Sequence, residues 1–476
     1  MRVAIIGGGI SGLSAAFYLE KERAGGAQIE YVLFESDTRL GGSMFSEQVD
    51  GCLVEGGPDS FITEKPWAAT LCNELGLGHR LIGSNDSERV TYILVNGRLV
   101  AMPDGLMFMV PTKLIPTALS PLFSWGTKIR MGLELLHPPR PMEGDETVAQ
   151  MVERHFGTEL VDRLADPLLS GVYGGDAASL SVRAVLPRFV EMEEKYGSLS
   201  RAMLAAHNKM VAAKKAAGAS KPRPLFTSLE GGMQELVDAI VARINPAAIR
   251  TGVKIESVAR SGAEWAVKTA AGTEKFDGVV VATPARVAGK LLEDVDQALA
   301  EDLKGIVYSS SVTATFGYSS EQLKGIPPGF GFLVPRTEGV RMMACTFTHK
   351  KFPKRAPEDK GMIRCFLGGS KDQAILDASD EEVRETCLRE LRQILKVDGV
   401  TKPRFERIYR WRGAMAQYTP GHLDRVARIE NSVKAHPALA VIGNAFKGIG
   451  VPDCVRSGQE AASMLGAMAK AGVKVS

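Results

Sequence analysis

Short apolar runs that alternate with longer helical patterns open the chain and return near its end. Residues 3–6 (VAII) form a continuous apolar run, which is typical of a parallel strand buried on both faces. Residues 11–22 follow with Leu13, Ala16, Phe17 and Leu19 on one side, a spacing that predicts a helix. Similar strands are predicted at 29–34, at 279–284 and before a C-terminal helix from about Cys454. The alternation predicts an α/β fold whose parallel sheet is built from distant segments.

The middle of the chain shows two other patterns. Residues 146–169 carry apolar positions at helical spacing, whereas 311–319, 341–349 and 361–369 read as strands before a helix at 381–395. We expect a helical insertion and a mixed sheet with helices on one side. The stretch 105–126 is apolar but interrupted by prolines. It predicts a helical cap with a buried face, or else a surface that contacts lipid or an apolar ligand. The Lys/Ala-rich tract 208–224 predicts a solvated helix end or loop.

Composition narrows the class of protein. The chain has 476 residues, which suits two or three domains, and 58 Lys and Arg against 55 Asp and Glu. This balance, without a basic stripe, argues against nucleic-acid binding. The six cysteines are scattered without metal-ligand spacing, so we expect reduced, buried thiols and no metal site. The absence of a signal-peptide pattern and of a long apolar run predicts a cytoplasmic protein.

The glycines after the first strand predict a dinucleotide site. Gly7, Gly9 and Gly12 match G-x-G-x-x-G, where glycines permit a tight turn, close approach of a pyrophosphate and close helix packing. The loop also holds Gly8, Ile10 and Ser11, at a helix start whose free N–H groups suit phosphates. Glu35 ends the second strand, where a carboxylate can bind a ribose. A glycine-rich turn without a ligand is the plainer alternative.

The next stretch indicates which dinucleotide. Glu35, Arg39 and Gly41-Gly42 form an E-x-x-x-R-x-G-G pattern, flanked by Ser36 and Ser43. This resembles flavoproteins of the glutathione-reductase-like superfamily, above all the amine oxidase, carotenoid desaturase and protoporphyrinogen oxidase group, and implies FAD. The resemblance places Val253 against the adenine and brings five more positions to the cofactor or its turn: Gly443, Gly450, Val451, Pro452 and Asp453. Asp453 is also expected to cap the helix that it precedes.

The resemblance implies three units, two of which are discontinuous in the sequence. Residues 1–90, 225–287 and 405–476 would form a Rossmann-type FAD-binding domain, as in p-hydroxybenzoate hydroxylase and amine oxidases. Residues 91–100 and 288–404 would form a mixed-sheet substrate-binding domain. Residues 101–224 would form a helical domain that faces a membrane or caps the substrate.

Longer motifs narrow the resemblance. PLLSGVYGGDAASLS (167–181), EGGPDSF (55–61) and the segment YRWRGAMAQYTPGH (409–422) match protoporphyrinogen oxidases, although Ala416 replaces a usual proline. The chain is similar throughout to the protoporphyrinogen and coproporphyrinogen III oxidase family, closest to its soluble Gram-positive branch. The resemblance implies a six-electron oxidation of coproporphyrinogen III or protoporphyrinogen IX in heme biosynthesis, with FAD, dioxygen as acceptor and hydrogen peroxide as by-product.

Site residues follow from that resemblance. Asp59, beside Gly57, Pro58 and Ser60, matches a position near flavin and substrate and is the candidate catalytic residue; an Asx-turn is the alternative. Trp411 matches a flavin-facing tryptophan, with an ordinary core aromatic as the alternative. Phe330, Leu333 and Phe366 match positions that clamp the macrocycle, and from spacing alone they would be core residues. The candidates for binding the substrate's propionates are Arg98, Lys65 and Lys113, because Met107 stands where some relatives carry an arginine.

Two rival functions and several partners stay open. The first rival is another oxidase of the same fold, an amine oxidase or a carotenoid desaturase; an amine oxidase would need an aromatic pair at the flavin, which Ala445-Phe446-Lys447 does not supply. A non-enzymatic member of the fold would have lost the glycines and Glu35, which are intact. Ferrochelatase as a partner, peripheral membrane contact, and a monomer or homodimer are all compatible with the sequence.

Overall fold

The computed structural model describes residues 1–107, 109–141, 143–217 and 223–472. A five-stranded parallel sheet has the order β12 (Ile249–Arg250), β2 (Glu30–Phe34), β1 (Arg2–Ile6), β16 (Gly278–Val281) and β22 (Leu439–Val441). Val3–Ile6 and Val279–Val281 are buried, as the continuous apolar runs predicted. The α/β class predicted from the sequence is confirmed, since strands from distant segments pair in parallel.

Alternate residues of each central strand face two different cores. Val3, Ile5 and Val280 pack with the helices α1 (Ile10–Ala24), α2 (Trp67–Glu74), α11 (Gln234–Val241) and α17 (Val451–Lys470). Ala4, Ile6, Val279 and Val281 pack toward the antiparallel strands β13 (Ile255–Ser261), β14 (Glu264–Thr269) and β15 (Gly272–Phe276), together with α12 (Ala285–Leu291), α13 (Gln297–Lys304) and α16 (His422–Lys434). The period-two alternation of the strands therefore separates the two layers.

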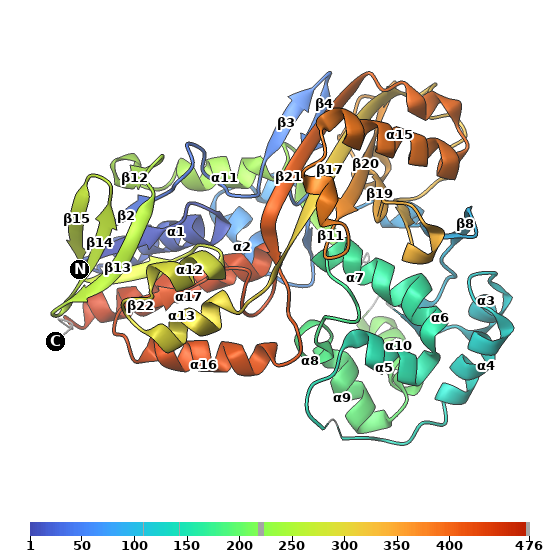
Figure 1. Ribbon diagram of the computed structural model, residues 1–476, viewed down its shortest axis with the longest axis horizontal. Coiled ribbons are helices and arrows are strands. Elements are labelled where there is room, and N and C mark those ends of the chain that lie inside the picture. Colours follow the sequence, from blue (N-terminus) through green and yellow to red (C-terminus); the bar gives the residue numbers. More distant parts are fainter. Residues whose placement is uncertain (108, 142, 218–222, 473–476) are drawn as a thin grey trace.

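A second, seven-stranded sheet forms the next unit (Figure 1). Its order is β21 (Phe405–Ala416), β17 (Tyr308–Ser319), β20 (Lys360–Gly368), β19 (Ala344–Phe347), β18 (Gly331–Leu333), β7 (Thr91–Val95) and β8 (Arg98–Ala101). Only β18 and β7 run parallel, so the sheet is mixed as predicted. The helix α15 (Asp380–Leu395) covers one face, and the short helix α14 (Thr348–Lys351) follows β19.

One predicted boundary differs from the observed pairing. Residues 405–416, which the sequence placed in the FAD-binding domain, form β21 and pair with β17 along the edge of the seven-stranded sheet. The chain returns to the five-stranded sheet only after Ala416. Local patterns could not show this, because a strand of half-buried residues fits either sheet. Two smaller sheets are formed by β3 (Ser46–Val49) with β4 (Cys52–Glu55), and by β5 (Phe61–Ile62), β11 (Phe226–Leu229) and β6 (Leu81–Gly83).

Helices gather in a third unit at the far end of the molecule from the N-terminus (Figure 1). They are α3 (Leu114–Leu119), α4 (Trp125–Glu134), α5 (Val148–Phe156), α6 (Thr158–Leu160), α7 (Asp166–Tyr173), α8 (Val182–Val185), α9 (Pro187–Tyr196) and α10 (Leu199–Ala217), after the strand pair β9 (Leu106–Met107) and β10 (Val110–Pro111). The cap predicted at 105–126 is only partly helical, and Ile115 and Leu119 of α3 are exposed rather than buried. Of the tract 208–224, α10 runs to Ala217, and 218–222 lie outside the described residues.

Candidate flavin and substrate site

The C-terminal ends of the parallel strands meet at one edge of the sheet. Gly7 follows β1 with φ +110°, Glu35 follows β2, and Gly443 follows shortly after β22. The helix α1 then begins at Ile10, with Gly9 as its N-cap and no side chain that accepts from its first N–H groups. A Cβ on Gly12 would lie 1.9 Å from the Gly7 carbonyl oxygen, so only glycine lets this helix approach the strand. The loop that holds Gly8, Ile10 and Ser11 is thus a strand–turn–helix, as predicted.

Glu35 organises this edge through both of its carboxylate oxygens. Its Oε2 accepts from the Gly8 N–H at 2.7 Å, and its Oε1 accepts from the Asp37 N–H at 2.8 Å and from the Ser36 hydroxyl at 3.1 Å. The Val253 N–H donates to the Glu35 carbonyl at 2.9 Å. Glu35 and Ser36 are therefore brought together with Val253, which is distant in the sequence, beside the glycine loop.

The second glycine pair contacts the first. Gly41 donates from its N–H to the Gly8 carbonyl at 2.8 Å, and a Cβ on Gly42 would lie 3.2 Å from the Gly9 Cα. The Arg39 guanidinium donates to the carbonyls of Leu40, Met44 and Gly42, so it shapes this turn from within. The Ser43 carbonyl in turn lies against Gly57, where a Cβ would overlap it. Two glycine loops and the segment 56–60 therefore form one continuous backbone surface.

Three side chains from the seven-stranded sheet hold the segment 56–60. Trp411 donates from Nε1 to the Gly56 carbonyl at 2.8 Å, and Thr313 donates to the same oxygen at 3.1 Å. Arg364 donates to the carbonyls of Gly56 and Gly57 at 3.1 and 2.6 Å and is almost fully buried. Trp411 was predicted, but Arg364 was missed, although it precedes the predicted Phe366 by two positions on β20 and therefore shares its face.

Asp59 forms an ion pair that the sequence did not reveal. Its carboxylate accepts from Lys351 Nζ at 2.8 and 3.1 Å and from the Ser60 hydroxyl at 2.7 Å. Burial acts to raise the pKa of Asp59, but the charges of Lys351 and Arg364 outweigh it and hold that pKa well below its usual range. Asp59 is therefore a paired carboxylate and not a free base. Lys351 lies in the KKFP stretch, after β19.

Behind this pair lies a cavity of about 10 Å³, the size of a single water molecule. Asp59, Arg364, Glu55 and Arg355 all line it. Burial raises the pKa of Glu55 to about 7, while the charge of Arg355 at 3.6 Å and hydrogen bonds from Ser46 and the Met233 N–H oppose the rise. The segment that carries Asp59 thus adjoins a buried cluster of two carboxylates, Asp59 and Glu55, and two guanidinium groups, Arg364 and Arg355.

The C-terminal turn corrects the predicted capping role of Asp453. The helix α17 begins at Val451, followed by Pro452, and its N-cap is Gly450. Asp453 is the third helical residue and is not the N-cap; its carboxylate instead accepts from Lys65 Nζ at 2.6 Å. Lys65 is thereby paired, and Lys113 likewise binds Asp104, so neither is an unpaired cation for propionates. Gly450 has no side chain that could cap α17, so the first N–H groups of this helix stay open to a ligand.

The predicted substrate residues are only partly brought together. Leu333, Ala344 and Phe366 form one row across β18, β19 and β20, and the Arg364 guanidinium lies 4.9 Å from the Phe366 ring. Leu333 also lies beside Gly171 of α7. Phe330 precedes β18 outside this row and is 8 % exposed. Arg98 is exposed near the turn between β7 and β8, on the edge strand of the sheet. The side chain of Met107 lies outside the described residues.

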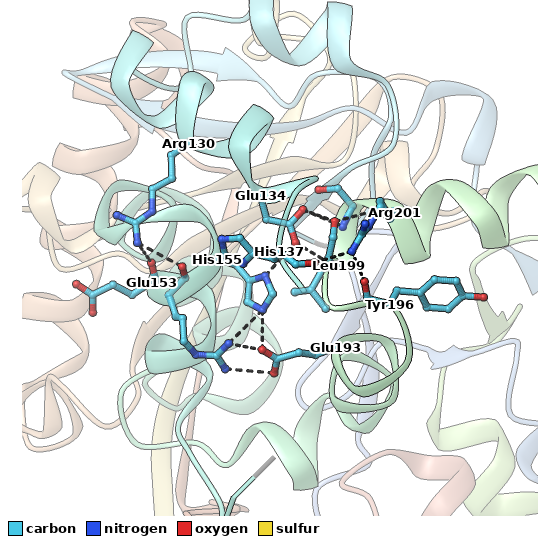
Figure 2. Close-up of polar contacts among 12 residues, drawn as sticks. Arg130, Glu134, His137, Glu153, His155, Glu193, Tyr196, Leu199 and Arg201 are labelled. Atoms are coloured by element: carbon cyan, nitrogen blue, oxygen red, sulfur yellow. Dashed lines mark hydrogen bonds and ion pairs between the residues drawn. The ribbon is translucent and has the colours of Figure 1, made fainter. Parts of the chain in front are cut away.

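One group in the helical unit has metal-ligand spacing: Glu134, His137 and His155 (Figure 2). Hydrogen bonds already engage its two buried members. His155 contacts Glu134 through Nδ1 at 2.9 Å and Glu193 through Nε2 at 3.2 Å. Glu134 also accepts from the Ser198 hydroxyl and from the N–H groups of Leu199 and Ser200. An imidazolium between two carboxylates accounts for this arrangement as an ion-pair network.

The edge of the five-stranded sheet fits a flavin dinucleotide. A Cβ added to Gly9 or Gly443 would meet no protein atom within 4 Å, although both glycines lie among closely packed turns. Two helices, α1 and α17, begin at this edge with no side-chain cap, so both offer free N–H groups and partial positive charge to phosphates. Glu35 supplies a carboxylate for a ribose at the same place.

Comparison with known proteins agrees with this geometry. The model of the flavin-containing amine oxidoreductase family matches residues 10–465. The chain belongs to this family and is an oxidoreductase, and the predicted cofactor, FAD, is that of a flavin-containing enzyme. Within the family, the chain falls in the group of protoporphyrinogen and coproporphyrinogen III oxidases, as the motifs predicted.

Three relatives define that group. The chain is 32 % identical to the coproporphyrinogen III oxidase of Bacillus subtilis, over 97 % of each protein. It is 29 % identical to the chloroplastic protoporphyrinogen oxidase 1 of Arabidopsis thaliana, over 96 % of this chain and 86 % of the other. The crystal structure of a candidate protoporphyrinogen oxidase from Exiguobacterium sp. 255-15 superposes with a TM-score of 0.86 at 30 % identity, over 98 % of both chains.

Proposed function

We propose that this protein oxidises a porphyrinogen, coproporphyrinogen III or protoporphyrinogen IX, to the porphyrin in heme biosynthesis, with dioxygen as the acceptor. The full-length similarity to oxidases named for these two substrates carries the proposal. A flavin held by the glycine loops and Glu35 would supply the redox chemistry between the substrate and dioxygen. Six electrons and six protons leave the substrate, and each pair of electrons reduces one dioxygen to hydrogen peroxide.

The protein's own residues would bind the cofactor and orient the substrate beside it. Gly7–Gly12, Glu35 and the start of α17 would hold the dinucleotide, and Trp411 with Arg364 would fix the segment 56–60 beside it. Asp59 holds Lys351 in place, so the Asp59–Lys351–Arg364 group carries one net positive charge. The row of Leu333 and Phe366 offers an apolar wall to a flat macrocycle. Asp59 is therefore proposed as a positioning residue and not as the proton acceptor.

Purified protein in air tests the proposal. We expect a yellow protein with flavin absorbance, and porphyrin fluorescence that rises after addition of coproporphyrinogen III or protoporphyrinogen IX, with three peroxides formed per porphyrin. Heat-denatured protein corrects for spontaneous oxidation. Bound flavin without oxidation of either substrate would favour another oxidase of the same fold, to be tested with amines. Protein that binds no flavin after incubation with FAD would contradict the enzyme function.

We further propose that α3 and α4 make peripheral contact with an anionic membrane. Trp125, Ile129 and Leu133 form an exposed stripe along α4, with exposed fractions of 71, 62 and 57 %. Ile115, Leu119 and Leu136 extend this apolar face, and Lys128 lies 4.6 Å from the Trp125 ring. Apolar and aromatic residues with basic neighbours suit the headgroup region of a bilayer. No helix in the described parts of the chain is long and apolar enough to cross one.

Sedimentation with lipid vesicles tests this contact. We expect binding to vesicles with anionic lipid, and at least a roughly tenfold weaker partition for a variant with Trp125→Ser, Ile129→Ser and Leu133→Ser, because three apolar side chains no longer enter the lipid. Leu423→Ser, at an exposed leucine on α16, is the matched control. Equal partition of both variants would contradict the proposal. Gel filtration, alone and with ferrochelatase, would show whether the same face instead serves a second copy or that candidate partner.

A further inference from the structure

A cavity of about 320 Å³ lies where the helical unit meets the seven-stranded sheet. Its walls come from α7 and the turn after it, from residues 334–343 after β18, and from residues 368–372 at the end of β20. The Ser370 N–H donates to the Gly174 carbonyl at 2.9 Å and joins two of these walls. The volume is at the lower end of the range for small-molecule sites, about 300–1,000 Å³. It therefore suits one edge of a ligand better than a whole macrocycle.

The cavity adjoins the row of proposed substrate residues. Val334, which lines it, follows Leu333 in the chain, and Leu333 lies beside Gly171 of α7. Met343, another lining residue, donates from its N–H to the Phe366 carbonyl at 2.8 Å. A ligand edge that enters the cavity would therefore continue from the apolar wall formed by Leu333 and Phe366.

The charged residues of the cavity differ in how fully they are paired. Lys371 lies between Asp166 at 2.7 Å and Asp176 at 2.9 Å, so two carboxylates more than balance its charge. Arg341 donates to both oxygens of Asp372, at 2.8 and 3.0 Å, and Glu382 lies 3.6 Å away. These pairs leave no positive charge for a ligand.

Arg336 is different. It lines the cavity in the short turn after β18, and its side chain makes no hydrogen bond or ion pair with any described residue. Arg336 is exposed, and it shares the lining of the cavity with the apolar side chains of Val334, Val340 and Met342 and with the ion pairs above. A planar guanidinium presents donors that match a carboxylate, and apolar walls suit the methylene groups that carry one.

We propose that this cavity binds a carboxylate side chain of the substrate and that Arg336 is its anchor. The inference rests on the proposed function, since the propionates of a porphyrinogen are the carboxylates in question. Among the cations that line the cavity, Lys371 and Arg341 are paired with carboxylates and Arg336 is not, so the cavity has one anchor for one carboxylate arm. Arg336 makes no ion pair with a described residue, whereas Lys65 and Lys113 are paired with aspartates.

Steady-state kinetics of Arg336→Gln test the inference. We expect the KM for coproporphyrinogen III to rise roughly fivefold to twentyfold with kcat nearly unchanged, because one charge-assisted contact in binding is lost. Arg336→Lys should recover part of this loss. The KM of the wild type should rise with salt, and that of Arg336→Gln should rise less, since the screened ion pair is gone. Arg140→Gln, at an exposed arginine outside the cavity, is the matched control.

The KM for protoporphyrinogen IX shows which carboxylate arm of the substrate enters the cavity. A rise in its KM as well means that the arm is a propionate shared by both substrates, and an unchanged KM means that it is one found only in coproporphyrinogen. An unchanged KM for both substrates overturns the inference. If the wild type oxidises neither substrate, the proposed function is wrong, but the cavity can still be tested. The affinity for coproporphyrin III is then measured by fluorescence quenching, and equal affinities of the wild type and Arg336→Gln overturn the inference.

Discussion

At the scale of single residues, the pairing of Asp59 with Lys351 sets the electrostatics of the candidate site. Both side chains are mostly buried, with exposed fractions of 18 and 14 %. An ion pair in such surroundings is costly to break, because the remaining partner is left as an uncompensated charge. Arg364 adds a second cation behind the same carboxylate. The sequence identified the aspartate through its motif, but the charge of the site depends on two residues about 300 positions away.

A double-mutant cycle measures this pairing. Asp59→Asn and Lys351→Met should each lower the free energy of unfolding, and the cycle should give a coupling of about 1–3 kcal/mol in urea unfolding. The exposed pair of Lys324 and Glu321 is the matched control and should couple by less than about 0.5 kcal/mol. Coupling energies that are equal in both cycles would show that Asp59 and Lys351 are not paired in solution. Because the pKa of Asp59 is held low, its ionisation should also be absent from the activity profile around neutral pH.

At the scale of elements, the two helices that start at the flavin edge pack closely against each other. Gly458 of α17 faces α1, and a Cβ there would lie 2.5 Å from the Ser11 carbonyl oxygen and 2.8 Å from the Ala15 nitrogen. Since backbone atoms cannot move aside cheaply, any larger residue must push the helices apart. The free N–H groups at the start of both helices would then separate from each other.

We expect Gly458→Val to lower the free energy of unfolding by about 2–3 kcal/mol and to reduce the flavin retained after purification. The ratio of flavin to protein absorbance and a thermal melt measure the two effects. Gly132→Ala on α4 is the control, because its added Cβ meets no atom within 4 Å, and it should be neutral or slightly stabilising. Full flavin content in Gly458→Val would show that the helix spacing does not matter for the cofactor.

At the scale of the whole molecule, each of the three units has an apolar core of its own. The helical unit also encloses a chain of buried charges from α4, α5 and α9 (Figure 2). Burial acts to lower the pKa of His155, but hydrogen bonds to Glu134 and Glu193 outweigh it and raise that pKa above its ordinary value of 6.5. Burial likewise acts to raise the pKa of Glu193, yet His155 and Arg154 lower it to about 2.

These shifts predict a pH window for stability. The contribution of His155 is complete below pH 6.5 and is lost as the pH rises through its raised pKa, whereas that of Glu193 is present above about 4.5 and is lost as the pH falls toward 2. His155→Leu should cost about 3 kcal/mol near pH 6 and less at alkaline pH, as measured by melting curves across pH. His436→Gln, beside the partly exposed Asp296, is the control. A cost that does not change with pH would mean that His155 is neutral.

The sequence by itself determined the parts that local backbone geometry specifies. The glycine loops, the carboxylate at the end of β2 and the buried parallel strands are visible in short stretches, because a turn that needs Gly7 or a helix that needs Gly12 constrains only its neighbours in the chain. The α/β class and the flavin therefore followed from the order of residues, and the longer motifs indicated the family.

Only the tertiary structure decided which distant side chains meet. It placed β21 in the larger sheet, paired Asp59 with Lys351 and Lys65 with Asp453, and left Arg336 unpaired among the described residues beside a cavity. None of these contacts has a local signature, because a lysine or an arginine looks the same in the sequence whether or not a carboxylate lies beside it in space. The packing of separate units against each other settles that question, and with it the charge of the site.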